Sequence, residues 1–338
     1  MTAIRLGLIG AGAVGVLHAD AAAGTPGVRV TAVCDIVAET ASRVAGPLNA
    51  AVFTDHRELI ASGLVDAVVV NTPHALHTDI VTDAAAAGLH VLVEKPMATR
   101  SEDCVVMERA CADAGVVLFV GHIQHFLPST AAAKAALDAG AVGSVLAVHD
   151  WRGTDYRPGS RPAWFFDPAV SGGGVFINIG THCVDRLLWL TGRRPVAVTA
   201  KAVHRGELLV ETDVLARLEL EDGAVGHITV TSTQLPARDE MTVIGERGTI
   251  RVARGSGAVL HPDDGSAPVV LADESADDVP TAFLDQLAAF AAAVRGEQPP
   301  VIPAAYGRHV VEAVESVYAS CATGERVLVP DWAEVPVG

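Results

Sequence analysis

The sequence is poor in positive charge, has few cysteines and contains no long uninterrupted apolar run. Lys and Arg number 24 against 40 Asp and Glu, which gives a formal net charge of −16. Because neutralising nucleic-acid phosphates requires clustered Lys and Arg, this balance argues against a nucleic-acid partner. A bound dinucleotide remains compatible with it, because backbone amides and a helix end hold such a ligand locally.

The five cysteines are scattered, and no two of them have the CxxC spacing of a zinc site. We therefore expect no metal site, and we interpret the cysteines as the reduced thiols of a cytoplasmic protein. No apolar stretch reaches the ~18–20 residues of a membrane span, so we expect no membrane partner. The apolar opening, Ile4–Leu17, carries glycines at patterned spacing and is interpreted as a strand and turn rather than a signal peptide.

The length of 338 residues favours two domains, since single cores seldom grow beyond ~250–300 residues. Half of the residues are apolar and 19% are charged, which is enough for a large core. The sequence pattern changes near residue 123. We predict a dinucleotide-binding domain over residues 1–122 and a substrate-binding and oligomerisation domain over residues 123–338, whose final helices are allowed to pack back on the first domain.

Short apolar runs alternate with alanine-rich amphipathic stretches in the first part of the chain. Nearly all-apolar strands are typical of a parallel sheet covered by helices on both faces, so this pattern predicts a doubly wound α/β fold of the Rossmann type. The expected strands are Ile4–Ile9, Val28–Cys34, Ala67–Val70, His90–Val93 and Val116–Val120, and the expected helices are Val14–Ala23, Ala38–Ala45, Ala75–Ala87 and Ser101–Ala114.

The second part of the chain has a different pattern. Runs of β-branched residues alternate with turns from Val196 to about Leu271, which indicates an antiparallel sheet. Helices are expected at Ser129–Ala139, near Thr181–Leu190 and over two stretches close to the C-terminus. We therefore predict an α+β domain with a large, mainly antiparallel sheet.

A glycine-rich loop, Gly10-Ala11-Gly12-Ala13-Val14-Gly15, follows the first strand and opens the first helix. The pattern GxGxxG in this strand–turn–helix context is typical of dinucleotide binding. Gly10 permits the tight turn, Gly12 lets a pyrophosphate approach the backbone, and the helix that begins at Ala13 and Val14 offers free N–H groups and a partial positive charge. An accidental glycine turn is the alternative.

Asp35 ends the second strand, 25 residues after Gly10, where an acid that binds the adenosine ribose is expected. Its carboxylate would accept the ribose hydroxyls and repel a 2′-phosphate, which favours NAD over NADP. Arg43 on the following helix is a candidate for stacking on adenine or for accommodating a phosphate, so NADP stays open. An Asp that only caps the next helix is the alternative for Asp35.

Two further candidate segments follow strands of the same sheet. Asn71-Thr72-Pro73-His74, with His77 three residues on, and Glu94-Lys95-Pro96 lie at carboxyl strand ends, where open α/β sheets bind ligands. Lys95 would stabilise negative charge on a reacting oxygen, and Pro96 allows a cis peptide. A turn with a helix cap and a surface lysine are the respective structural alternatives.

The stretch from Gly172 to Asp185 carries the richest pattern. A run of three glycines precedes Asn178, His182 and Asp185, which are spaced four and three residues apart and project from one side of a helix. Histidine suits proton transfer at neutral pH, and glycines let a ligand or another backbone approach closely. A histidine with a purely structural role is the alternative.

Together, GAGAVG, EKP and GGG-x3-N-x-G-x-H-x2-D resemble the glucose–fructose oxidoreductase/inositol dehydrogenase/MocA family over essentially the whole chain. The resemblance implies that Lys95 contacts substrate and nicotinamide and that His182 is the acid/base. Asn178 stands where many members have Asp, and an amide cannot stabilise an imidazolium electrostatically. The family often has Arg near the position of His125, so we expect the substrate contacts of this chain to differ from those of the family in this region. We expect His122 to bind substrate there. Some relatives that act on nucleotide-linked amino sugars share the Asn.

A loop rich in Arg and aromatic residues precedes the glycines. Guanidinium donors and aromatic faces suit a polyhydroxylated or anionic ring, so we expect Arg152 and Tyr156 to bind substrate and Trp164 to flank the nicotinamide. A surface loop held by Arg–Asp pairs is an equal alternative for any one of these residues.

The first hypothesis for function is an NAD(P)-dependent dehydrogenase or reductase of a sugar, cyclitol or related polyol, with NAD preferred. Lys95, Asn178 and His182 would be its catalytic residues, and the resemblance implies a homodimer or homotetramer formed through the sheet domain. An NAD-dependent glycosidase that works by transient oxidation and elimination is the second hypothesis. A catalytically silent nucleotide-binding protein is the third.

Overall fold

The computed structural model describes residues 3–232 and 237–332, which fall into two compact units. The first unit holds the chain up to Ile123 together with Val279–Arg308, and the second holds Gln124–Asp278 and the chain from His309 onward. The return of Val279–Arg308 places α9 (Asp278–Val294) and the start of α10 (Ala304–Thr323) in the first unit.

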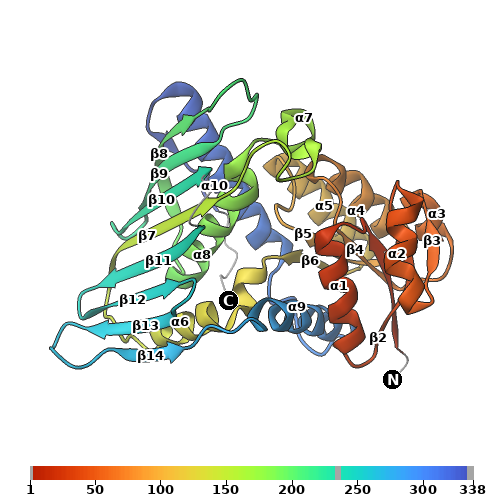
Figure 1. The fold of residues 1–338 in the computed structure, drawn as a ribbon, viewed down its shortest axis with the longest axis horizontal. Helices are drawn as coiled ribbons and strands as arrows, with labels where there is room; N and C mark the ends of the chain where they lie inside the picture. Colours follow the sequence, from red (N-terminus) through yellow and green to blue (C-terminus); the bar gives the residue numbers. More distant parts are fainter. Residues whose placement is uncertain (1–2, 233–236, 333–338) are drawn as a thin grey trace. The chain divides into compact units, whose positions relative to one another are not determined.

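The first unit contains a six-stranded parallel sheet in the order β3-β2-β1-β4-β5-β6. Helices lie on both faces of this sheet (Figure 1), and the all-apolar strand β4 is fully buried as such coverage requires. The predicted Rossmann-type fold is thereby confirmed, although the short elements β3 and α3 were not predicted. The strands are β1 (Ile4–Ile9), β2 (Val28–Cys34), β3 (Ala51–Phe53), β4 (Ala67–Val70), β5 (His90–Glu94) and β6 (Leu118–Gly121), and the helices are α1 (Ala13–Gly24), α2 (Ala38–Leu48), α3 (His56–Ala61), α4 (His77–Ala86) and α5 (Ser101–Ala114).

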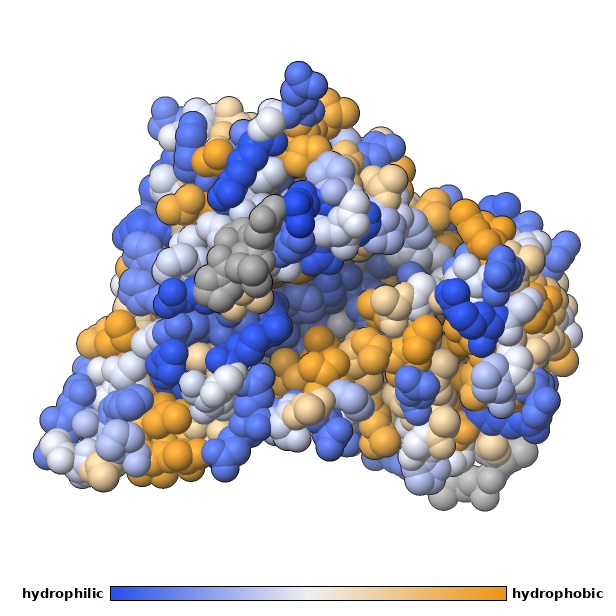
Figure 2. Space-filling view, in the orientation of Figure 1, coloured by the Kyte–Doolittle hydropathy of each residue, from blue (hydrophilic) through white to orange (hydrophobic). Residues whose placement is uncertain are grey.

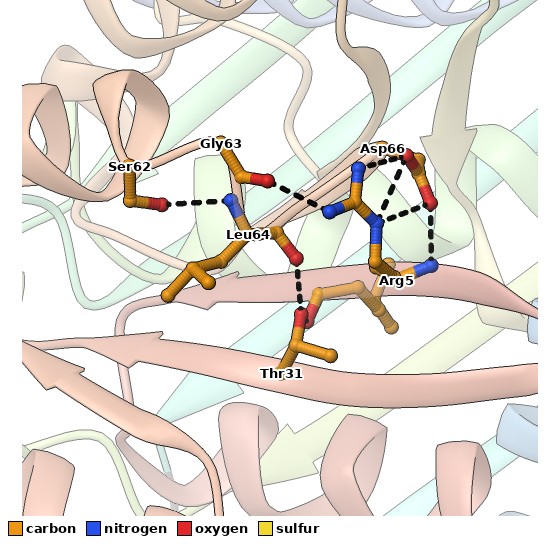
Figure 3. A network of polar contacts seen from close by, with 7 residues as sticks. Arg5, Thr31, Ser62, Gly63, Leu64 and Asp66 are labelled. Atoms are coloured by element: carbon orange, nitrogen blue, oxygen red, sulfur yellow. Dashed lines mark hydrogen bonds and ion pairs between the residues drawn. The ribbon is translucent and has the colours of Figure 1, made fainter.

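A polar network fixes the beginning of β1 against the residue that precedes β4 (Figure 3). The backbone N–H of Arg5 donates to Oδ2 of Asp66 at 2.9 Å, and its guanidinium donates to the same carboxylate from Nη2 at 2.6 Å. Thr31 on β2 donates to the carbonyl of Leu64 at 2.8 Å. The network lies at the amino end of β1, whereas the glycine loop follows the carboxyl end, so it sets strand register away from the candidate site.

The second unit contains a nine-stranded mixed sheet in the order β14-β13-β12-β11-β7-β10-β9-β8-β15. Among its described strands, all neighbouring pairs are antiparallel except β7 with β10, which agrees with the predicted mainly antiparallel sheet. The strands are β7 (Val145–Thr154), β8 (Pro195–Val203), β9 (Asp213–Leu220), β10 (Val225–Ser232), β11 (Arg238–Gly245), β12 (Gly248–Ala253), β13 (Gly257–Pro262), β14 (Val269–Ala272) and β15 (Val327–Leu328), and the helices are α6 (Pro128–Asp138), α7 (Pro168–Ser171) and α8 (Thr181–Thr191).

Helices α6 and α8 cover one face of this sheet, and the described elements leave the other face open (Figure 1). Burial alternates along the central strands accordingly: in β9, Leu218 is buried while Leu215 and Arg217 are exposed. The edge strand β14 exposes Val269 and Val270, and hydrophobic residues gather where β13 and β14 lie, at the lower left of Figure 2.

Candidate active site

The strand order of the first unit reverses between β1 and β4, and the glycine loop follows the carboxyl end of β1 at this point. Gly10 has φ +93°, and a Cβ there would lie 2.7 Å from the carbonyl oxygen of Asn71, the residue after β4. Asn71 also donates from Nδ2 to the Gly10 carbonyl at 3.5 Å. The two strand-end segments therefore touch, and only glycine fits between them.

The amino end of α1 fits a pyrophosphate. No side chain caps this helix, the loop residues Gly12, Ala13 and Val14 are exposed, and a Cβ on Gly12 would meet nothing within 4 Å. Among the described residues, Oγ1 of Thr72 and Oδ1 of Asn71 are buried without a hydrogen-bond partner. Uncapped N–H groups and unsatisfied polar atoms at one sheet edge are what a bound dinucleotide would complete.

Asp35 follows β2 and is half-buried. Its Oδ2 accepts the backbone N–H of Ala11 in the glycine loop at 2.9 Å, and its Oδ1 accepts that of Val37 at 3.0 Å. A carboxylate has about four acceptor positions, so capacity for ribose hydroxyls remains. Arg43 lies on the exposed side of α2, where it lines a shallow groove together with Val16 and Pro47.

Lys95 follows the last residue of β5 and is half-buried between the buried residues Glu94 and Pro96, and the Lys95–Pro96 peptide is cis. Oε1 of Glu94 lies 2.9 Å from Nε2 of His18, a fully buried residue of α1. Burial alone would raise the pKa of the Glu94 carboxyl, but the hydrogen bond from His18 and the charges of His18 and Lys95 lower it below its ordinary value. The residue before Lys95 is thus anchored as a buried carboxylate.

His77 connects the two strand-end segments. Its ring is fully buried, with Nδ1 at 3.1 Å from the Pro96 carbonyl and Nε2 at 3.0 Å from the Thr72 carbonyl. Burial lowers the pKa of His77, and its backbone hydrogen bonds offset part of that effect. We predicted cofactor binding by His77, Thr72 and Pro73. The structure places Thr72 and Pro73 half-buried at the strand end. It places the His77 ring beneath the two loops, where both ring nitrogens face backbone carbonyls.

In the second unit, Asn178 lies on a π-helical turn, Phe176–Gly180, that leads directly into α8. His182 lies on the first turn of α8 and is half-buried, while Asn178 is buried. Asp185 is fully buried, and its Oδ1 lies 2.8 Å from Nε2 of His125. Single π turns inside α-helices frequently mark functional sites. The predicted helix is present, and the π turn at Asn178 was not predicted.

Arg152 takes part in a buried ion network under the sheet. Arg186 donates to both oxygens of Asp150 at 3.0 and 2.7 Å and to Oδ1 of Asp239 at 2.8 Å, and Arg152 binds the other oxygen of Asp239. Burial would raise the pKa of Asp239, but the two guanidinium groups lower it to about 2. The structure therefore gives Arg152 a partner within the chain, beside the predicted substrate role.

The remaining predicted contacts lie in aromatic surroundings. The Tyr156 side chain is fully buried, and its hydroxyl donates to the Phe165 carbonyl at 3.2 Å. Trp164 stacks on Phe165 with ring centroids 3.7 Å apart. His122, in the first unit, is buried, and its ring meets that of Tyr306 edge-on at 5.8 Å.

Sequence reasoning missed two residues of the second unit, Glu211 and Tyr318. The Glu211 carboxylate accepts the backbone N–H groups of Gly174 and Phe176, and the Tyr318 hydroxyl donates to Glu211 and accepts the N–H of Ile177. No local pattern could have indicated them, because Glu211 lies 37 residues from Gly174 and Tyr318 lies 141 residues from Ile177. Within the described residues, no group of three or more His, Cys, Asp or Glu side chains is arranged to hold a metal ion.

The fold and the glycine loop at the point where the strand order reverses are those of a nicotinamide-dependent oxidoreductase. Residues 4–122 match the model of an oxidoreductase family with an NAD-binding Rossmann fold, and residues 130–251 match the GFO/IDH/MocA C-terminal domain. The chain is 32% identical over 238 residues to the rhizopine catabolism protein MocA of Rhizobium meliloti, which covers 68% of this chain and 72% of that protein. The chain therefore belongs to the GFO/IDH/MocA family, binds NAD and is a dehydrogenase or reductase rather than a catalytically silent protein.

Two further relatives bear on the chemistry. Inositol 2-dehydrogenase of Rhizobium meliloti strain 1021 is 34% identical over 200 residues, covering 59% of this chain and 58% of that protein. The crystal structure of the WlbA dehydrogenase of Bordetella pertussis, in complex with NADH and UDP-GlcNAcA, superimposes with a TM-score of 0.86 at 27% identity, covering 97% of this chain and 98% of that chain.

No helix in the described part of this chain has the length and apolar character needed to cross a membrane.

Proposed function

We propose that this enzyme transfers a hydride between nicotinamide and a secondary alcohol or ketone of a sugar, a cyclitol or a sugar derivative. The observation that carries the proposal is the position of Lys95. It is a half-buried amine at the carboxyl end of β5, at the same sheet edge as the open glycine loop, and it is flanked by the anchored carboxylate of Glu94. An ammonium group there stabilises developing charge on a substrate oxygen.

Each of the predicted site residues would have a distinct role in binding or proton transfer. The bound nicotinamide supplies the hydride acceptor or donor. Lys95 donates a hydrogen bond to the reacting oxygen, and His182 takes the hydroxyl proton during oxidation. The buried amide of Asn178 orients the substrate hydroxyl. The uncapped amino end of α1 and Asp35 hold the pyrophosphate and the adenosine ribose, respectively.

The substrate class is supported by the names of relatives. One relative is named an inositol 2-dehydrogenase, and a structural neighbour is complexed with NADH and UDP-GlcNAcA. Many family members have Asp at the position of Asn178, whereas some relatives that act on nucleotide-linked amino sugars resemble this chain in having Asn. We therefore include sugar nucleotides beside free sugars and cyclitols as candidate substrates.

The test is a screen of purified protein with NAD and with NADP against sugars, cyclitols and sugar nucleotides, with the reduced cofactor followed by its absorbance. We expect substrate-dependent NADH formation by the wild-type protein and its loss in Lys95→Met. Lys134→Met, a lysine paired with Asp138 on α6, is the matched control. Product formation from glycosides without net NADH formation would instead support transient oxidation and elimination, and no turnover of any kind would refute the proposal.

We propose in addition that the enzyme works in the cytoplasm as a homodimer or homotetramer joined through the open face of the nine-stranded sheet. Leu215 and Trp151 expose 52% and 43% of their surface on this face, and the Arg238 guanidinium lies 3.9 Å from the centroid of the Trp151 ring. Light scattering after size exclusion tests this: the wild-type protein should be oligomeric, and Trp151→Glu should shift it toward monomer. A monomeric wild-type protein would contradict the assembly.

A further inference from the structure

Two residues distant in sequence satisfy the first four backbone N–H groups of the helix that carries Asn178 and His182. Glu211 accepts the N–H of Gly174 at 2.8 Å and that of Phe176 at 2.9 Å with its carboxylate, and it accepts that of Val175 at 3.0 Å with its backbone carbonyl. The Tyr318 hydroxyl accepts the N–H of Ile177 at 3.0 Å and donates to Glu211 Oε1 at 2.8 Å. Helix starts normally leave these groups to side-chain caps, water or ligands.

The glycine run has its physical reason in this arrangement. A Cβ on Gly174 would lie 2.1 Å from the carbonyl oxygen of Glu211, and a Cβ on Gly173, which has φ +159°, would lie 2.2 Å from the Tyr318 hydroxyl oxygen. The glycines thus let Glu211, two residues before β9, and Tyr318 of α10 approach the backbone. The sequence left open whether a ligand or another backbone approaches the run. In the structure it is the backbone and carboxylate of Glu211 that occupy the amino end of this helix.

The arrangement is also favourable electrostatically. Glu211 is buried, with 4% of its surface exposed, and a buried carboxylate is costly unless hydrogen bonds compensate it. Here two backbone N–H groups, one hydroxyl and the positive end of the helix dipole face it. Burial and the neighbouring Glu211 raise the pKa of Tyr318 well above its ordinary value, so the phenol stays protonated and donates. We call Glu211 and Tyr318, together with the four backbone N–H groups that they accept, the clamp.

The clamp acts on the segment where the helix is irregular. The π turn Phe176–Gly180 begins within the clamped segment, because the N–H groups of Phe176 and Ile177 are two of the four that are held. Asn178 lies within this turn, and His182 follows on the first turn of α8. Phe176 and Ile177 are clamped at their backbone, so rotation and translation of this turn are fixed from its first residue. A shift of the clamp would displace Asn178 and His182 together.

We propose that Glu211 and Tyr318 are positioning residues that set the placement of Asn178 and His182, and this inference rests on the proposed role of His182 in proton transfer. Neither residue is assigned a contact with substrate or cofactor. Their effect is on the geometry of the proton-transfer residues, and misplacement by about 1 Å is enough to lower turnover by up to ~10²-fold.

The test uses Glu211→Gln and Tyr318→Phe in the full-length protein. The glutamine directs an NH₂ group at N–H donors, and the phenylalanine leaves the Ile177 N–H without its acceptor. We expect kcat to fall by about 10- to 100-fold in Glu211→Gln and by a smaller factor in Tyr318→Phe, with the KM for NAD within about twofold of wild type. Glu207→Gln, an exposed carboxylate on the preceding loop, is the matched control and should leave kcat unchanged.

A second measurement does not depend on turnover. In histidine-labelled protein, the ring signals of His182, assigned with His182→Gln, should shift in position and titration in both clamp variants, while those of His149 and His227 on the open sheet face stay unchanged. If wild-type protein turns over no polyol, the proposed function fails, and this spectrum still decides the clamp. Folded variants that keep both kcat and the His182 signals of the wild type would overturn it, even if their melting temperatures fall.

Discussion

The carboxylate of Asp35 is tied to the glycine loop: its Oδ2 accepts the backbone N–H of Ala11 at 2.9 Å. The acid that we expect to face the adenosine ribose is therefore held in place by the loop that we expect to hold the pyrophosphate. The residue directly after Asp35 is Ile36, which exposes 90% of its surface and carries no charge to attract a 2′-phosphate.

We predict that NAD(H) binds more tightly than NADP(H), because the Asp35 carboxylate would repel a 2′-phosphate. Intrinsic-fluorescence titration of both cofactors gives the dissociation constant of NADP(H) divided by that of NAD(H). Asp35→Ser should reduce this ratio by about tenfold or more, as expected for the loss of a like-charge contact of ~1.4 kcal/mol. Glu39→Gln, an exposed acid on α2, is the control. Equal or reversed affinities in the wild type would remove the ribose role from Asp35.

Replacing Lys95 with Met or Ala should lower turnover by at least about 10²-fold, the usual scale for loss of an acid/base or oxyanion contact. Affinity for NAD should change little, because the glycine loop and Asp35 lie on other strand ends. Steady-state kinetics and a separate NAD titration distinguish the two effects. Activity that survives in both variants would make Lys95 an ordinary lysine without a role in the reaction.

Asn178→Asp should move the acidic limb of the pH–rate profile for oxidation to higher pH, with the fold unchanged. A carboxylate at position 178, on the π turn that leads into α8, would favour the imidazolium form of His182 and raise the pH at which the base becomes deprotonated. The measurement is kcat/KM against pH for both proteins. An unmoved limb, together with an inactive His182→Ala variant, would leave Asn178 as a substrate ligand only.

Arg152→Ala and Tyr156→Phe should both raise the KM for substrate while leaving NAD affinity unchanged. Arg152→Ala should also lower the free energy of unfolding by about 1–3 kcal/mol, because Asp239, whose side chain is only 18% exposed, loses one of its two guanidinium partners. Chemical denaturation measures this loss, and Arg157→Ala, whose partner Asp155 is at the surface, is the control. If neither variant changes KM, this loop supports the fold alone.

Acid sensitivity should increase when His18 is replaced by Leu. The folded pKa of Glu94 is lowered, so its contribution to stability is present above the unfolded pKa of about 4.3 and is lost as the pH falls through the folded value. Without His18 the folded pKa rises and the acid-unfolding midpoint, followed by circular dichroism, should move to higher pH. His56→Leu removes a more exposed His–Asp pair and should have a smaller effect. Equal midpoints in the two variants would contradict the anchoring of Glu94.

Local patterns sufficed where a property is encoded over a few adjacent residues. The alternation of apolar strands and amphipathic helices predicted the parallel sheet, and Gly10, Gly12 and Gly15 predicted a turn that needs little more than backbone freedom. The short elements β3 and α3 were missed because three and six residues give too little periodicity to detect. The roles of Lys95, Asn178 and His182 came from a pattern shared with a family, and they stay predictions.

By itself, then, the sequence determined the Rossmann-type unit, the mainly antiparallel sheet and the family, because periodicity and turn residues act over short stretches of chain. Only the tertiary structure decided that β7 pairs in parallel with β10, that Val279–Arg308 belongs with the first unit, and that His18, His77, Glu211 and Tyr318 anchor the predicted segments. The physical reason is distance along the chain: the Glu211 carboxylate meets an amide 37 residues away, and nothing in the local pattern of either segment records that contact.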